Sequence, residues 1–150
     1  MRLLALDVGD RRVGVAVSDL VGLIAAPLDV IQRSSKDKDF ARIAHLVREQ
    51  GAGKLVIGHP LNADGTAGPQ ALRVERYAVA LSEALRLEGL SVPVIMWDEY
   101  GSTQRAQSLM IGAGRRAKDR RQRIDAVAAA VILQDYLDQQ QSKTGHQDLR

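Results

Sequence analysis

The chain has 150 residues, of which 45% are hydrophobic and 26% are charged, with a net charge of +3, which suits one globular domain with a full core. It contains no cysteine, and this excludes disulfides, thiolate metal sites and cysteine nucleophiles. No run approaches the roughly 20 apolar residues of a membrane helix, and the N-terminus lacks a signal-peptide pattern, so we expect a cytoplasmic protein without membrane contact.

Three short apolar runs open the chain, at 3–8, 13–18 and 23–31. The turn-like segments GDRR and DLVG separate them. Strands joined by such short connections pair antiparallel, because parallel neighbours need a long crossover. The runs therefore predict an antiparallel meander of three strands.

Helices and strands alternate after the meander. Phe40, Ile43, Ala44 and Val47 fall at helical spacing and predict a helix that ends near Gly51. The remaining predicted elements are a strand at 54–58, a helix from Pro69 to about Gly89, a strand at 92–97, and helices at about 102–112 and 124–137.

The element order predicts an α/β fold. Each of the two later strands follows a helix, so both are expected to run parallel to the first strand, with helices on both faces of a five-stranded mixed sheet. Residues 1–138 are predicted to form a single domain. Residues 139–150 are polar, and we expect a disordered tail there.

Acidic residues stand where hydrophobicity does not explain them. Asp7 lies within the first strand, the pair Asp98–Glu99 follows the last strand, and Asp125 opens the last helix. Sites in open α/β proteins form at the carboxyl ends of the strands. Carboxylates gathered there repel unless a cation compensates, and Mg²⁺ or Mn²⁺ is the natural partner. Two such ions support phosphodiester cleavage.

Each acid also has a structural alternative, and the sequence leaves open whether the acids converge. Asp7 also fits a strand-end residue bonded to turn amides, and Asp98 fits a turn cap. Glu99 fits a plain surface acid, and Asp125 fits a helix N-terminus stabilised by the dipole.

The basic residues are concentrated in the segment GRRAKDRRQR at 114–123. A concentrated basic patch attracts polyanions better than the same charge spread out. The alternative is a solvated connector between two helices. The candidate contacts with a nucleic-acid backbone are Arg115, Arg116, Lys118, Arg120 and Arg121.

Four ordered blocks resemble the signature blocks of the YqgF family, also called RuvX-like, over residues 2 to about 138. The blocks are LALDVGDRRVGVAVSD, KLVIGHPLNADGTAGPQ, VIMWDEYGST and IDAVAAAVILQDYL. The family is described as Holliday-junction resolvases and as nucleases that mature the 5′ end of pre-16S ribosomal RNA. The resemblance implies a ribonuclease H-like fold, with Asp7, Glu99 and Asp125 as catalytic residues and metal ligands.

The chain departs from the family pattern directly after Glu99. The family commonly has Arg followed by an apolar residue where this chain has Tyr100 and Gly101. Tyr100 therefore fits base stacking on single-stranded nucleic acid as well as packing. Arg11 and Arg12 fit contacts with substrate phosphates or a solvated turn, and Asn62, in a turn-rich loop, fits substrate contact or a structural role.

These observations favour a metal-dependent nuclease acting on structured nucleic acid, most simply in pre-16S rRNA maturation with ribosomal particles as partners. Holliday-junction resolution on branched DNA competes with this role and would require a two-fold homodimer. A non-catalytic nucleic-acid-binding module is a further alternative. An ATP-binding protein of the actin–sugar kinase type fits less well, because such proteins clamp nucleotide between two domains.

Overall fold

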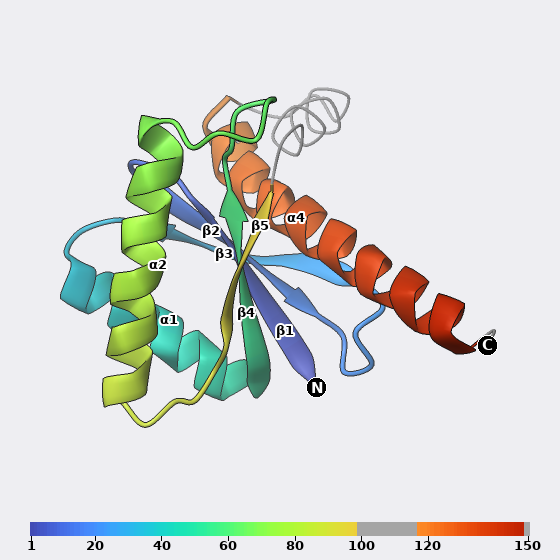
Figure 1. Ribbon diagram of the computed structural model, residues 1–150. Helices are drawn as coiled ribbons and strands as arrows, with labels where there is room; N and C mark the ends of the chain where they lie inside the picture. Colours follow the sequence, from blue (N-terminus) through green and yellow to red (C-terminus); the bar gives the residue numbers. More distant parts are fainter. Residues whose placement is uncertain (99–116, 149–150) are drawn as a thin grey trace.

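A computed structural model describes residues 1–98 and 117–148, and these residues contain a five-stranded mixed sheet (Figure 1). The strands are β1 (Arg2–Val8), β2 (Arg12–Ser18), β3 (Ala25–Gln32), β4 (Ala52–His59) and β5 (Val94–Asp98). They lie in the order β3-β2-β1-β4-β5. Neighbours in the β1–β3 meander are antiparallel, whereas β4 is parallel to both β1 and β5. The predicted topology is confirmed.

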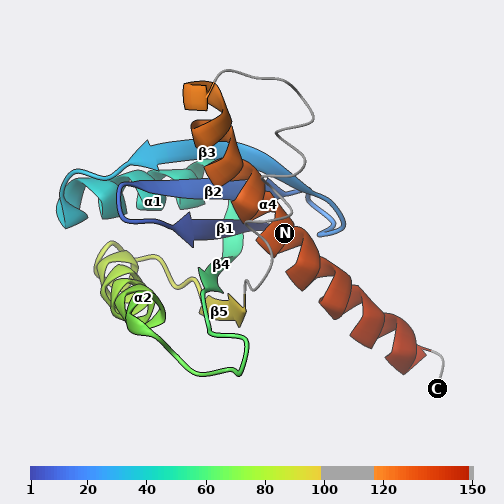
Figure 2. The same cartoon turned by 90° about the horizontal axis from the view of Figure 1, so that it is seen from above.

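Helices cover both faces of the sheet, as the sequence predicts. The helices α1 (Lys36–Gln50) and α2 (Pro69–Leu87) lie on one face, and α4 (Ala117–Asp148) crosses the other (Figures 1 and 2). The helix predicted at about 102–112 falls outside the described residues. Among the helices described here, none is long and apolar enough to cross a membrane.

The capping residues explain where α1 begins and ends. The Ser35 side chain accepts a hydrogen bond from the Lys38 amide and caps the N-terminus. Gly51 ends the helix with φ of 62°, a left-handed conformation that favours glycine. The helix begins before Phe40, the first apolar residue of its pattern, because its first turn is polar and leaves no trace in the apolar periodicity.

Helix α4 is longer than the predicted 124–137. It begins at Ala117 within the basic segment and continues to Asp148, through most of the expected tail at 139–150. Glutamine, lysine and arginine are good helix formers and no proline interrupts the run, so the helix continues after its apolar face ends. Figure 2 shows its C-terminal turns projecting beyond the sheet.

Strand β1 separates two apolar cores. Leu6 and Val8 belong to the core beneath α1 and α2. Leu3 and Ala5 pack with the residues of α4 on the other face. Because side chains alternate along a strand, Asp7 belongs to the face covered by α4. This alternation directs the carboxylate of Asp7, a candidate site residue, toward the α4 face of the sheet.

Small side chains allow α4 to lie close to the sheet. Ala5 of β1 and Ala16 of β2 are fully buried and face each other across the strands. On the helix, Ala129 is fully buried against them in the same core. Alanine on both surfaces brings the helix backbone near the strands, so helical residues at this level can approach the end of β1.

Candidate active site

Asp7 lies near the carboxyl end of β1, the central strand of the sheet. It is half-buried, and its cross-strand partner on β2 is Gly14. Residues paired directly across an antiparallel ladder direct their side chains to the same face. The neighbour of Asp7 beneath α4 is therefore a residue without a side chain.

Helix α4 fills the space that a side chain on residue 14 would occupy. A Cβ atom built on Gly14 would lie 1.9 Å from the Asp125 carbonyl oxygen and 2.3 Å from its carbonyl carbon. No residue other than glycine fits there without moving the helix backbone. Asp125, in α4, and Asp7, on β1, are thus brought to the same glycine from two different elements.

Arg12 fixes the Asp125 carboxylate. It is the first residue of β2, two positions before Gly14, and its Nε donates to Asp125 Oδ2 at 2.5 Å. Their side chains are 28% and 25% exposed, so the pair is partly shielded from water. A charge-assisted hydrogen bond of this kind fixes the orientation of the carboxylate and offsets its charge. Arg12, predicted to contact substrate phosphates, therefore has an acidic partner within the protein.

Replacing Arg12 with alanine is expected to lower the free energy of unfolding by about 1 kcal/mol, because the lost pair is partly exposed. The same change is expected to slow cleavage about tenfold, because Asp125 loses its orientation. Urea unfolding and single-turnover cleavage measure the two effects. Arg42→Ala, which removes the exposed pair with Asp29, is the control. Cleavage at the wild-type rate in Arg12→Ala would contradict the positioning role.

Several predicted site residues fall outside the described part of the chain. Glu99, Tyr100, Arg115 and Arg116 are in the range 99–116. Lys118, Arg120 and Arg121 are in the first turns of α4, but their side chains are not among those described. Strand β5 ends at Asp98, which pairs with His59 of β4, so Glu99 directly follows the end of a strand parallel to β4.

Asp98 lies on the opposite face from Asp7. Trp97 packs in the core beneath α4, whereas Met96 packs against the core beneath α1 and α2. By alternation the Asp98 side chain belongs with Met96. Asp98 is exposed. Strand β5 therefore directs Asp98 away from the face of the sheet that α4 covers.

Asn62 and Arg11 both have structural contacts. The Asn62 side chain donates to Thr66 Oγ1 at 2.9 Å, and its carbonyl accepts from the amide of Gly65, which has φ of 86°. Asn62 is exposed and organises its own loop. The Arg11 side chain is exposed, and its carbonyl accepts from the Arg33 amide at 2.8 Å.

The residues present fit a hard divalent cation. Asp7 and Asp125 offer carboxylate oxygens, the ligands that Mg²⁺ and Mn²⁺ prefer, and both adjoin Gly14. Among the side chains that the structure describes, at 1–98 and 124–142, no group of three acidic or histidine side chains is arranged to hold a metal. The third predicted ligand, Glu99, falls outside that range.

Gly14 and the pairing of Arg12 with Asp125 were not predicted from the sequence. The available signal was a glycine inside the strand VGVAV, where glycine often marks close approach of another backbone. Its partner was not evident, because residues 14 and 125 are far apart in the chain.

The chain matches proteins of one family over almost its full length. The family model described as "RuvX: Holliday junction resolvase" matches residues 1–139. A relative from Thermoanaerobacter pseudethanolicus, named "Putative pre-16S rRNA nuclease", is 46% identical over 145 residues, which cover 95% of this chain and all of that protein. A relative of the same name from Geobacillus kaustophilus is 44% identical over 140 residues, covering 92% of this chain and 98% of that protein.

The fold is similar to that of solved RuvC structures. Thermus thermophilus RuvC in complex with a Holliday junction substrate aligns with a TM-score of 0.60 and 16% identity, covering 95% of this chain and 96% of RuvC. This similarity identifies the ribonuclease H-like architecture, as predicted, and the sequence matches identify the family. The chain belongs to the RuvX family of nucleases.

Proposed function

We propose that this nuclease hydrolyses phosphodiester bonds in structured nucleic acid at the end of β1, with Asp7, Asp125 and Glu99 as catalytic residues. The observation that carries the proposal is the contact between Gly14 and the backbone of Asp125, which brings a second carboxylate to the cross-strand partner of Asp7. The two carboxylates lie at the carboxyl end of the central strand. Open α/β proteins bind their ligands at that end of the sheet.

Asp7, Asp125 and Glu99 would hold Mg²⁺ or Mn²⁺. When bound, such a cation lowers the pKa of water and neutralises charge on the transferring phosphate. Asp7 contributes a carboxylate fixed by the central strand. Asp125 contributes one held by Arg12 at 2.5 Å. Both carboxylates are held by regular secondary structure, so these two proposed ligands are preorganised.

The remaining predicted contacts would bind the substrate around this centre. Arg11 lies in the turn between β1 and β2, and Arg12 is the first residue of β2. Asn62 lies in the loop after β4. The basic segment that contains Arg115, Arg116, Lys118, Arg120 and Arg121 would contact backbone phosphates, because closely spaced cations release the counterions of a nucleic acid. Tyr100 would stack on an unpaired base.

We infer pre-16S rRNA as the physiological substrate, bound in ribosomal particles, because the relatives at 44–46% identity carry that name. The corresponding compartment is the cytoplasm. The second candidate substrate is a four-way DNA junction, which the description of the family model and the RuvC complex favour. That reaction requires symmetric cuts in two strands and therefore a homodimer.

The test is cleavage of labelled pre-16S 5′-leader RNA and of a synthetic four-way DNA junction, each with Mg²⁺, Mn²⁺ or EDTA. We expect metal-dependent cutting of the leader RNA in preference to the junction. Faster, symmetric cutting of the junction by a dimer would favour the second candidate. The absence of metal-dependent cutting of either substrate would contradict the proposed function.

A further inference from the structure

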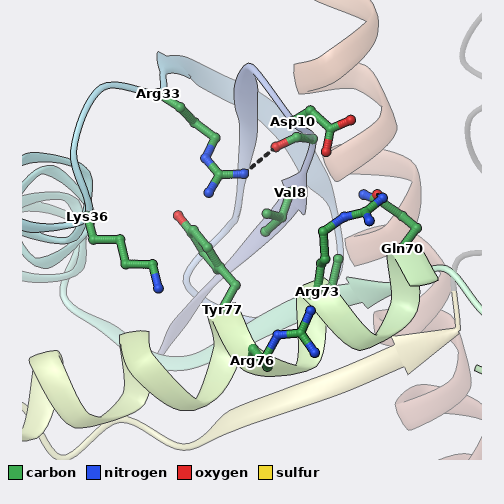
Figure 3. Close-up of a pocket in the computed structure, with 10 residues that line it drawn as sticks. Val8, Asp10, Arg33, Lys36, Gln70, Arg73, Arg76 and Tyr77 are labelled. Atoms are coloured by element: carbon green, nitrogen blue, oxygen red, sulfur yellow. Dashed lines mark hydrogen bonds between the residues drawn. The ribbon is translucent and has the colours of Figure 1, made fainter. Parts of the chain in front are cut away.

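A basic cavity lies on the opposite face of β1 from Asp7. It has a volume of about 280 Å³ and is bounded by the end of β1, the start of α1 and the first half of α2 (Figure 3). Val8 and Gly9 contribute its wall from β1 and the turn that follows. Val8 directly follows Asp7, so one strand end contributes to the candidate active site on one face and to this cavity on the other.

Four cationic side chains line the cavity: Arg33, Lys36, Arg73 and Arg76. Throughout the described residues, no carboxylate forms an ion pair with any of these four side chains. The one acid in the lining is Asp10, whose carboxylate points away from Arg33 in Figure 3. With four cations and one acid, the described lining has a formal charge of +3. Cations gathered around a cavity without acidic partners attract an anion there.

Tyr77 contributes a buried donor to the same cavity. The residue is 4% exposed, and its hydroxyl has no hydrogen-bond partner among the residues that the structure describes. Figure 3 shows that hydroxyl directed toward the side of the cavity where Arg33 and Lys36 lie. Burial raises the pKa of Tyr77 to about 12, so the hydroxyl keeps its proton and donates. A buried hydroxyl without a partner costs stability, so its position calls for an acceptor.

Arg33 is held in place at the cavity wall. Its Nη1 donates to the Gly9 carbonyl at 2.7 Å, and its guanidinium lies 5.2 Å from the centre of the Tyr77 ring. Phe40 contacts the same ring in an edge-to-face arrangement, with the two ring centres 5.2 Å apart. The hydroxyl and the guanidinium are therefore fixed relative to each other before any ligand binds.

We propose that this cavity binds a phosphate group, with Arg33, Lys36, Arg73 and Arg76 as its cationic contacts and Tyr77 as a neutral donor. Phosphate fits because it accepts hydrogen bonds at several oxygens and the lining side chains are donors with high positive charge. The group is carried either by a nucleic-acid strand that continues from the active site or by a small phosphate compound. Binding of a nucleic-acid phosphate in this cavity rests on the proposed function, whereas binding of a small phosphate compound does not.

The first arm of the test uses inorganic phosphate in EDTA. Thermal unfolding is followed with increasing potassium phosphate at ionic strength held constant with KCl. The charge variant is Lys36→Gln/Arg76→Gln, and its control is Lys38→Gln/Arg86→Gln, which removes the same charge from the same two helices outside the cavity. Phosphate is expected to raise the Tm of the wild type and the control but not that of the charge variant.

Tyr77→Phe separates binding from folding. Removing an unpartnered hydroxyl is expected to leave the Tm without phosphate at or above the wild-type value. The same change is expected to weaken phosphate binding about tenfold, because the phosphate loses one charge-assisted hydrogen bond. An unchanged or raised Tm together with a loss of phosphate affinity is not the result of a damaged core.

The second arm distinguishes the two sources. Binding of a fluorescein-labelled single-stranded RNA is measured by anisotropy in EDTA over a range of salt. A strand phosphate in the cavity predicts weaker binding by the charge variant than by its control, a salt slope smaller by about 0.7, and competition by inorganic phosphate. Equal RNA affinity in both variants, with phosphate binding lost in the charge variant, assigns the cavity to a small phosphate compound.

The proposal is overturned if phosphate stabilises the charge variant and Tyr77→Phe as much as the wild type, or stabilises none of them. Both arms measure binding without divalent metal. Their failure is therefore separate from a failure of the proposed nuclease reaction, which the cleavage assays report.

Discussion

Replacing Asp7 with asparagine is expected to slow metal-dependent cleavage by about three orders of magnitude, because a metal-held phosphate transfer depends on several kcal/mol from its carboxylate ligands. Asparagine keeps the shape of the side chain and removes its charge. Asp7 is half-buried at a strand end, so the fold is expected to survive the change. Single-turnover cleavage measures the rate, and urea unfolding of the same preparation measures the stability of the fold.

The matched control for Asp7→Asn is Asp37→Asn, an exposed carboxylate in the first turn of α1. It removes the same charge far from Gly14 and is expected to cleave at the wild-type rate. Cleavage by Asp7→Asn within a factor of a few of the control would show that the β1 carboxylate has no part in catalysis.

Replacing Gly14 with alanine is expected to lower the free energy of unfolding by about 3 kcal/mol, at the high end for an overpacked position. The added Cβ would meet backbone atoms on α4, 1.9 Å from the Asp125 carbonyl oxygen and 3.0 Å from the Ala126 nitrogen. A backbone cannot rotate away as a side chain does, so the helix must shift. That shift moves Asp125 away from Asp7, and cleavage is expected to fall about a hundredfold in the folded fraction.

Gly89→Ala is the control for Gly14→Ala. Gly89 follows α2 and has φ of 80°. A Cβ atom added at Gly89 would have no neighbouring atom within 4 Å among the described residues. Its replacement is expected to cost about 1 kcal/mol through backbone strain alone and to leave cleavage unchanged. Equal effects of the two changes would contradict the close contact between β2 and α4.

The antiparallel meander and the parallel direction of the two later strands were predictable because each rested on a local rule. Short turns required the antiparallel meander, and a helix before each of the later strands permitted parallel pairing. The length of α4 was not predictable from its apolar face, because its first and last turns are polar and extend beyond the packed segment around Ala129. Periodicity reports where a helix is buried, not where it begins or ends.

The sequence singled out candidate site residues but not their arrangement. Asp7 and Asp125 stood out as charges beside apolar runs, yet nothing in the sequence shows that both adjoin Gly14. The cavity lined by Arg73 and Arg76 was not predictable from the sequence for a related reason. Those arginines occupy the polar positions of an ordinary helix, and only the fold brings Arg33 from the end of β3 to face them.

The proposal that Asp7 and Asp125, together with Glu99, would hold a divalent cation at the end of β1 is central to the proposed function. Calorimetric titration with Mn²⁺ of the wild type, Asp7→Asn, Asp125→Asn and the control Asp138→Asn tests it most directly, since Asp138 is an exposed acid on the same helix as Asp125. We predict that each site variant loses at least about tenfold in Mn²⁺ affinity while the control matches the wild type. Unchanged Mn²⁺ affinity in both site variants would contradict the account.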